Sequence, residues 1–189
     1  YLLIHKYWVF IEARELGIPW LGLLHDNSKF RPDELIPYAA FFYEPNGAKK
    51  TIRDSTGYYK PTDTGDEAFD HAWLRHQRRN KHHWQRWIRI DHWPCHISDH
   101  DRYTLPEDDG RIKCLACKES FPQAEADIRT LPMPDRYRRE MLADWRGAGL
   151  AQGTPDTLRW YTVNRHKMHL HPETRAWIEK QLRFVEPSA

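Results

Sequence analysis

Residues 25–29 read His-Asp-Asn-Ser-Lys, and this short stretch decides how the rest of the chain is interpreted. It closes a helical segment that we expect over residues 20–29. A histidine followed by an aspartate at a helix end can turn both side chains toward one metal ion. The imidazole supplies a neutral nitrogen, and the carboxylate can bridge to a second ion. His25 and Asp26 are therefore candidate metal ligands.

Two further candidate ligands lie on other predicted helices. His5 precedes the pair by 20 residues, on an amphipathic helix expected over residues 2–17. Asp144 lies on a late helix expected over residues 134–147. A His-Asp pair alone is common by chance, and His5 would also suit a partly buried helix position. The metal interpretation therefore depends on the order of these residues along the chain and on the position of Lys29, three residues after Asp26.

The composition fits a soluble globular protein with helical segments along most of its length. Of 189 residues, 40% are hydrophobic and 30% are charged, and the formal net charge of +2 gives no argument for nucleic acid or a membrane. No apolar run approaches the roughly 18 residues of a membrane span, and no signal-peptide pattern opens the chain. Further helices are expected over residues 32–42, 66–90, 155–169 and 172–185. We predict an all-α fold in the cytoplasm.

Histidines on the expected long helix at residues 66–90 indicate a second metal position. His76 and His83 are seven residues apart and would share a helix face, and His82 is next to His83. In two-metal HD phosphodiesterases, a class that the chain resembles in the motifs given below, such histidines complete a second site, so this resemblance implies His76 and either His82 or His83 as ligands with Asp26 as a bridge. The alternative is a solvated basic face, formed by these histidines with Arg75, Arg78, Arg79 and Lys81.

The segment 91–131 lacks helical periodicity and holds all three cysteines. His92-x-x-Cys95 is followed by Cys114-x-x-Cys117, and two such pairs are typical of the two knuckles of a zinc ribbon. Four ligands of the Cys3His type satisfy tetrahedral Zn²⁺, and a small module with little apolar content needs such a staple. We therefore predict a structural zinc site in this segment.

The fourth zinc ligand is open to alternatives. His96 and His100 compete with His92 for this place, and three unrelated thiols would leave no zinc site. A closed site of four protein ligands is structural, so we expect no catalysis there. The predicted organisation is a helical domain of residues 1–90 and 132–189 that carries a small inserted zinc-ribbon-like module.

The order of His5, His25-Asp26 and Asp144 resembles that of the HD superfamily of metal-dependent phosphohydrolases. In that superfamily a lysine three residues after the aspartate is frequent, and Lys29 fits this position. The chain also resembles an uncharacterised family of phage and bacterial HD-like proteins. The motifs that carry this resemblance are His25-Asp26-x-Ser-Lys-Phe, Ala72-Trp73-x-x-His76, Arg79-Asn80-Lys81-His82-His83-Trp84, Met133-Pro134 and Glu140-Met141-x-x-Asp144-Trp145. The resemblance implies an HD-domain-like helical bundle with a metal site, inside a host or bacterial cell, and no particular substrate.

The ligand set and the resemblance together predict hydrolysis of a nucleotide or another small phosphate ester. One or two divalent ions (Mn, Fe, Co, Ni, Mg or Zn) would activate a water molecule and polarise a phosphoryl oxygen. Lys29 and an arginine, Arg75 or Arg79, would neutralise the phosphate charge. Glu140 lies one turn before Asp144 and would orient a ligand or the water.

Two other functions use the same residues. An HD-type di-iron oxygenase could have the same ligands, and the sequence does not separate it from a hydrolase. A zinc-ribbon protein that binds nucleic acid through its basic helix, with a vestigial HD site, is the third interpretation. The nearly neutral net charge disfavours it.

Overall fold

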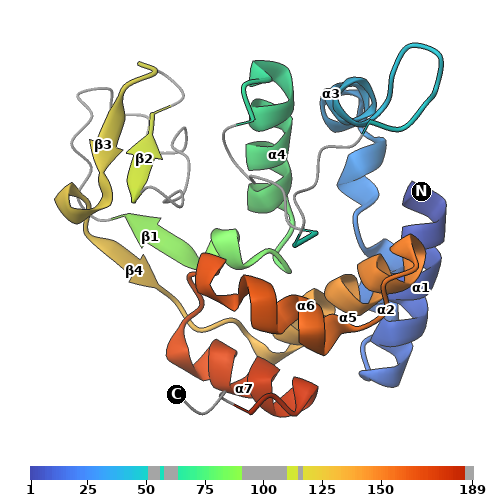
Figure 1. Ribbon diagram of the computed structural model, residues 1–189. Coiled ribbons are helices and arrows are strands. Elements are labelled where there is room, and N and C mark those ends of the chain that lie inside the picture. The colour runs from blue at the N-terminus through green and yellow to red at the C-terminus, as the bar shows by residue number, and fades with distance from the viewer. Residues whose placement is uncertain (51–55, 58–63, 91–109, 115–116, 186–189) are drawn as a thin grey trace. The chain divides into compact units, whose positions relative to one another are not determined.

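The computed structural model describes residues 1–50, 56–57, 64–90, 110–114 and 117–185 (Figure 1). Within these residues the fold is mainly helical, as expected, with four short strands. The contacts divide the chain into two compact units, Tyr1–Asn27, Asn80–Trp87 and Leu131–Ala189 in the first and Ser28–Arg79 and Ile88–Thr130 in the second. None of the described helices has the length and apolar character needed to cross a membrane.

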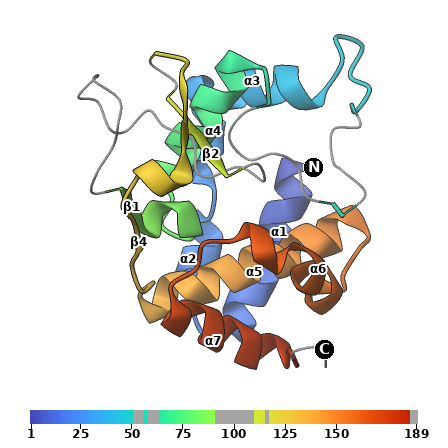
Figure 2. The same cartoon turned by 60° about the vertical axis from the view of Figure 1, so that its left-hand side comes forward.

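The first unit is built from helices that contact α5. Its helices are α1 (Leu2–Glu15), α2 (Pro19–Leu24), α5 (Asp135–Gln152), α6 (Thr157–Asn164) and α7 (Pro172–Leu182), with 3-10 turns at Trp84–Trp87 and Arg165–Lys167. α1 packs along α5 and also against α2, and α6 and α7 contact α5 as well (Figure 2). Pro172 opens α7, where the His171 ring accepts the backbone N–H of Glu173. This start agrees with the sequence prediction.

Two glycines allow α1 to approach its neighbours closely. A Cβ atom at Gly147 of α5 would lie 2.7 Å from the backbone nitrogen of Val9, and one at Gly22 of α2 would lie 2.5 Å from the Ala13 Cβ. Val9 and Ala13 are buried at this contact, together with Ala143. A larger residue at either glycine would therefore push α1 away from its neighbours.

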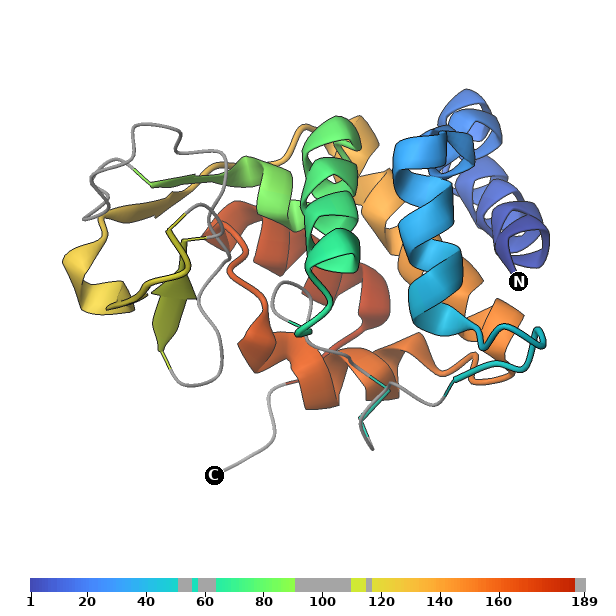
Figure 3. The ribbon, with the colours of Figure 1, turned by 90° about the horizontal axis from the view of Figure 1, so that it is seen from above.

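The second unit contains two helices and the four strands. α3 (Pro32–Phe42) and α4 (Glu67–Arg79) pack against each other (Figure 3), and the rings of Phe41 and Phe69 stack between them at 3.8 Å. Pro32 opens α3 at the position that the sequence indicated. Aromatic packing on this scale accounts for the pairing of the two helices.

The strands form two antiparallel pairs. β1 (Ile88–Ile90) pairs with β4 (Ile128–Thr130), and β2 (Arg111–Lys113) pairs with β3 (Ser120–Pro122), with Gln123–Glu125 as a 3-10 turn. Ile90 lies opposite Ile128, so the segment between these two residues begins and ends at neighbouring positions. This arrangement fits an insertion. The boundaries at 91 and 131 stay a prediction, because residues 91–109 lie outside the described part.

The long helix expected over residues 66–90 was wrong, because α4 ends at Arg79. A turn follows in which the His83 N–H donates to Asn80 O, and the Trp87 indole N–H donates to Lys81 O. The His82 ring is buried there, and its burial and polar contacts outweigh the helical propensity of the segment. His76 and His83 therefore do not share a helix face. The helix expected over residues 20–29 likewise ends early, at Leu24.

Candidate metal centre

Four predicted ligands meet in the first unit. His5 lies on α1, His25 and Asp26 follow the end of α2, and Asp144 lies on α5. Asp144 Oδ1 is 3.1 Å from His5 Nε2 and 3.3 Å from His25 Nε2. Asp26 Oδ2 is 3.5 Å from His25 Nε2 and 3.7 Å from His5 Nε2. Residues from three separate helical segments thus converge on one small volume.

The separations from Asp144 match those between neighbouring ligands of one ion, and those from Asp26 are slightly longer. With metal–ligand bonds of about 2.1 Å, ligand atoms at octahedral or tetrahedral angles lie about 3.0–3.4 Å apart. His5, His25 and Asp144 each offer an atom within 4.8 Å of the others. His25 Nε2 is buried and faces the carboxylates of Asp26 and Asp144. A metal ion would satisfy this nitrogen, so the group could hold one.

A second group of histidines adjoins Asp26. Asp26 Oδ1 lies 3.4 Å from His82 Nε2, and Asp26, His82 and His83 offer ligand atoms within 4.8 Å of one another. The ring centroids of His82 and His83 are 4.2 Å apart. The two carboxylate oxygens of Asp26 thus face different histidines. A carboxylate in this position could bridge two ions.

Glu140 contacts two of these histidines from the side of the ring away from Asp26. Its Oε1 lies 3.2 Å from His25 Nδ1 and 3.2 Å from His82 Nδ1. A carboxylate that accepts the Nδ1–H of a histidine leaves Nε2 as the atom with a lone pair. Glu140 therefore contacts the opposite ring nitrogens from those that face Asp26.

The charges at the centre shift several pKa values. Burial lowers the pKa of His25, but the charge of Asp26 and the contacts with Asp144 and Glu140 outweigh it and raise the pKa to about 10. Burial, reinforced by the charge of His25, lowers the pKa of His82. Burial opposes ionisation of Glu140 and Asp144, but hydrogen bonds from the histidines hold the pKa of each below its ordinary value. Both carboxylates are therefore ionised at neutral pH, as metal binding requires.

The backbone at Asp26 adopts a conformation that few residues other than glycine use. Its φ is 56°, in the left-handed region, where aspartate is tolerated better than most residues. The Lys6 ammonium group donates to His25 O and, at 2.8 Å, to Asn27 Oδ1. Lys6 thereby holds the backbone just before Asp26 and the side chain of the residue just after it. Sequence reasoning missed this residue, and the only signal was a lysine directly after His5.

The other predicted residues belong to the second unit. His76 Nδ1 lies 2.8 Å from Glu34 Oε2, and both side chains are fully buried. Arg79 donates to Glu34 at 2.7 Å and to Asp33 at 2.6 Å. Glu34 was not among the predicted residues, and its place in the first turn of α3 resembles that of any helix-capping acid.

The remaining predicted cations are also in the second unit. The Lys29 ammonium group lies 5.6 Å from the centre of the Tyr38 ring, and Arg75 Nη1 lies 3.6 Å from Asp33 Oδ2. The roles predicted for Lys29, Arg75 and Arg79 at a metal-bound phosphate, and for His76 as a ligand of a second metal, stay predictions.

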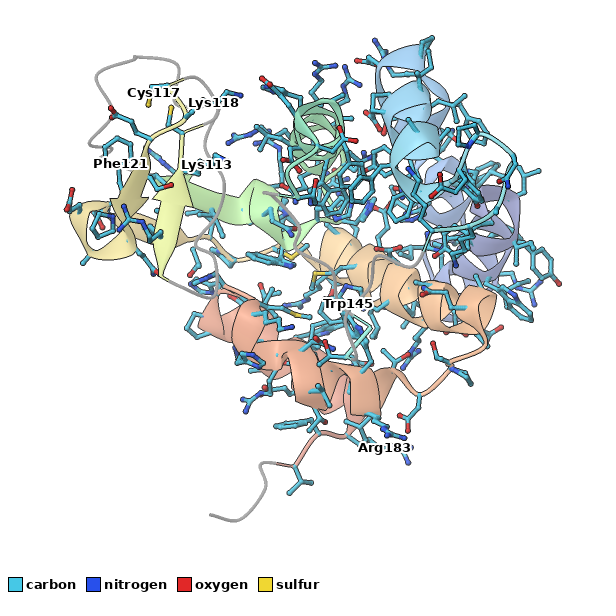
Figure 4. All side chains as sticks on the ribbon, turned by 45° about the horizontal axis from the view of Figure 1, so that its top comes forward. Lys113, Cys117, Lys118, Phe121, Trp145 and Arg183 are labelled. Atoms are coloured by element: carbon cyan, nitrogen blue, oxygen red, sulfur yellow. The ribbon has the colours of Figure 1, made fainter. Side chains whose placement is uncertain are left out.

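The cysteine site is described only in part. Cys114 follows β2 and is buried, and Cys117 is half-buried; Figure 4 places Cys117 and Lys118 at the turn between β2 and β3. The Cys114 N–H donates to Glu119 O, the Lys118 N–H donates to Cys114 O, and Lys118 has a φ of 65°. The two sulfurs are not joined by a disulfide. His92 and Cys95 lie outside the described residues, so the zinc site stays a prediction.

The described chain is a mainly helical protein with buried histidine and carboxylate clusters that could hold a metal ion. By sequence it belongs to a family of unknown function, DUF5662, which matches residues 1–184. No curated protein and no solved structure matches it. Since the family carries no assigned activity, a function must be argued from the geometry of the site.

Proposed function

We propose that this chain is a metal-dependent phosphohydrolase with an HD-like helical bundle, acting on a nucleotide or another small phosphate ester. The observation that carries the proposal is the convergence of His5, His25, Asp26 and Asp144 at separations of 3.1–3.7 Å. The order of these four residues along the chain is the order that the resemblance to the HD superfamily implied. Two histidines and two carboxylates suit a divalent transition metal.

The residues divide into two metal subsites. The first subsite consists of His5, His25, Asp26 and Asp144, and the second consists of Asp26, His82 and His83. Bound divalent ions would lower the pKa of a coordinated water and polarise a phosphoryl oxygen. Asp26 would contribute one oxygen to each subsite, and Glu140 would hold the rings of His25 and His82.

One edge of the centre is more exposed than the rest, and this edge would admit water and substrate. The side chain of Asp144 is 18% exposed, whereas those of His25 and Asp26 are 0% and 1% exposed. A catalytic metal needs an open coordination position, while a structural one is closed by protein ligands. We therefore place the open position and the reacting phosphate on the Asp144 side of the first subsite.

Metal content measured by elemental analysis, followed by a screen of nucleotides and phosphate esters with the metal-loaded protein, tests the proposal. Phosphate release by the wild-type protein, and its loss in Asp144→Asn, would support it. A loaded protein that neither releases phosphate from a nucleotide or phosphate monoester nor cleaves a phosphodiester to a monoester would overturn it.

The second candidate is a di-iron oxygenase. The observation that favours it is Asp26, whose two oxygens face different histidines, since a bridging carboxylate in a histidine-rich site also suits iron. An optical spectrum of the iron-loaded protein and an oxygen electrode distinguish the two candidates. Oxygen consumption with an organic substrate, without phosphate release, would favour the oxygenase.

A further inference from the structure

We propose that Glu140 is a positioning residue shared by the two metal subsites, so that one side chain sets the affinity for both ions. The inference rests on the metal centre of the proposed function. It extends the expectation that Glu140 orients a single ligand to one ligand in each subsite. His25, His82 and Glu140 also offer ligand atoms within 4.8 Å of one another, but Glu140 faces the Nδ1 atoms and not the Nε2 atoms that face Asp26, so it is placed outside both ligand sets.

The geometry of Glu140 is that of a shared hydrogen-bond acceptor. The same oxygen, Oε1, lies 3.2 Å from the Nδ1 atoms of His25 and His82. His25 belongs to the first subsite and His82 to the second, and their ring centroids are 4.3 Å apart. An acceptor at Nδ1 fixes the tautomer and the rotation of a metal-binding imidazole and makes its Nε2 a better donor to the ion. One carboxylate therefore orients one ligand of each ion.

The burial of Glu140 makes this contact strong. The residue is 6% exposed, and its neighbours Met141, Leu142 and Ala143 on α5 are at most 1% exposed. A charged hydrogen bond away from water is stronger than one at the surface. Rotation of the carboxylate away from either histidine would also leave a buried charge without that partner. Glu140 therefore has little freedom to serve one histidine at the expense of the other.

The charge balance of the metal centre also favours a shared role for Glu140. Asp26 and Asp144 supply two negative charges against the four positive charges of two divalent ions. Glu140 lowers the remaining excess to one positive charge, which a hydroxide or an anionic substrate can balance. Loss of its charge would raise the electrostatic cost of filling both subsites, since the carboxylate adjoins a ligand of each.

Metal titration of matched variants by calorimetry, with Zn²⁺ as the probe, tests the inference. The wild-type centre should bind two ions. An ion that binds to the wild-type protein but not to Cys114→Ser belongs to the cysteine site and is not counted. His82→Ala should lose only the second ion and keep the affinity for the first. Glu140→Gln keeps the size of the side chain and should lower the affinity for each of the two ions by about 10–100-fold.

Glu179→Gln provides the control for charge loss. Glu179 lies in the same unit, where it accepts hydrogen bonds from Tyr161 and Arg165, and its replacement should leave both affinities unchanged. Thermal unfolding of the metal-free variants separates folding from positioning. If Glu140→Gln lowered the melting temperature but bound both ions with wild-type affinity, Glu140 would be merely structural and the inference would be wrong.

Nitrogen-15 NMR of the Zn²⁺-loaded protein gives a readout that a structural role would not affect. The Nδ1–H groups of His25 and His82 should give two proton signals protected from exchange, and Glu140→Gln should shift both signals. If Glu140→Gln shifted only one of the two signals, or lowered the affinity for only one ion, the shared role would be wrong. A wild-type centre that binds one ion would overturn it too, whereas a centre that binds none would overturn the proposed function itself.

Discussion

Both units bury a glutamate against the Nδ1 atom of a histidine, but they balance the charge differently. In the second unit Glu34 is paired with His76 and also with the Arg79 guanidinium group, at 2.8 and 2.7 Å. In the first unit Glu140 is paired with His25 and His82. The ion pairs described for Asp26 and Asp144 also have histidine partners.

The difference concerns the source of positive charge. Arginine carries its charge at every accessible pH, so Arg79 balances the charge of Glu34 without a metal ion. Histidine supplies charge only when protonated, and a buried protonated histidine is costly. Metal ions can replace those protons. We therefore expect the helices of the first unit to depend on the metal at this centre and the Glu34–Arg79 pair between α3 and α4 to be independent of it, and the following predictions test this contrast.

The largest effect is expected from Asp26→Ala, because it removes oxygens that face both groups of histidines. Metal affinity should fall by more than the roughly 100-fold typical of residues outside the ligand shell, and phosphate release should fall to background. Elemental analysis and a phosphate assay measure both. Asp33→Ala, which removes a carboxylate from the second unit, is the matched control and should retain the metal.

Metal removal should destabilise the helices of the first unit more than α3 and α4 of the second. At a free metal concentration of about 100 times Kd, binding stabilises the folded state by about 2.7 kcal/mol. Hydrogen exchange followed by mass spectrometry, with and without a chelator, should show lost protection in α1, α2 and α5. An equal loss in α3 and α4 would contradict the contrast between the two units.

Gly147→Ala should weaken the centre without touching a ligand. The added Cβ would lie 2.6 Å from Val9 Cγ2 and 2.7 Å from Val9 N, so α1 must move together with His5. Overpacking of this kind costs about 1–3 kcal/mol, which chemical denaturation would measure. Adding Val9→Ala relieves only the side-chain clash, so the double variant should recover in part. Full recovery would mean that the backbone approach is unimportant.

The smallest effect is expected at the surface of the second unit. The hydrogen bond from Arg79 holds the pKa of Asp33 at about 2, below its model-compound value of 3.8. This pair contributes stability above pH 3.8 that is lost as the pH falls through about 2. In Arg79→Ala the pKa of Asp33 should rise toward 3.8, as an NMR titration would record. An unchanged pKa would show that Arg79 is not its cause.

The grouping of His5, His25, Asp26 and Asp144 was predicted from the local His25-Asp26 motif and from the order of the four residues, which resembles that of the HD superfamily. His25 and Asp26 follow a short helix, and His5 and Asp144 lie on helices that were expected near their observed bounds. The start of α3 at Pro32 was equally visible, since proline favours the first turn of a helix. These features depend on a few neighbouring residues.

Features that depend on distant partners could not be predicted in this way. α4 ends at Arg79 because His82 turns inward to Glu140, which lies far along the chain. The left-handed backbone of Asp26 and the contact of Gly147 with Val9 also depend on packing between segments. No periodicity within a single segment carries this information.

The pairing of β1 with β4 has a consequence for how this chain could be altered. Because Ile90 and Ile128 are cross-strand neighbours, the residues between them form one segment whose two ends are adjacent. A tight hairpin turn in place of that segment would close a shorter loop, which lowers the entropic cost of pairing β1 with β4. We therefore expect this strand pair to tolerate another peptide in place of the segment, while the helices that carry the histidines keep their connections.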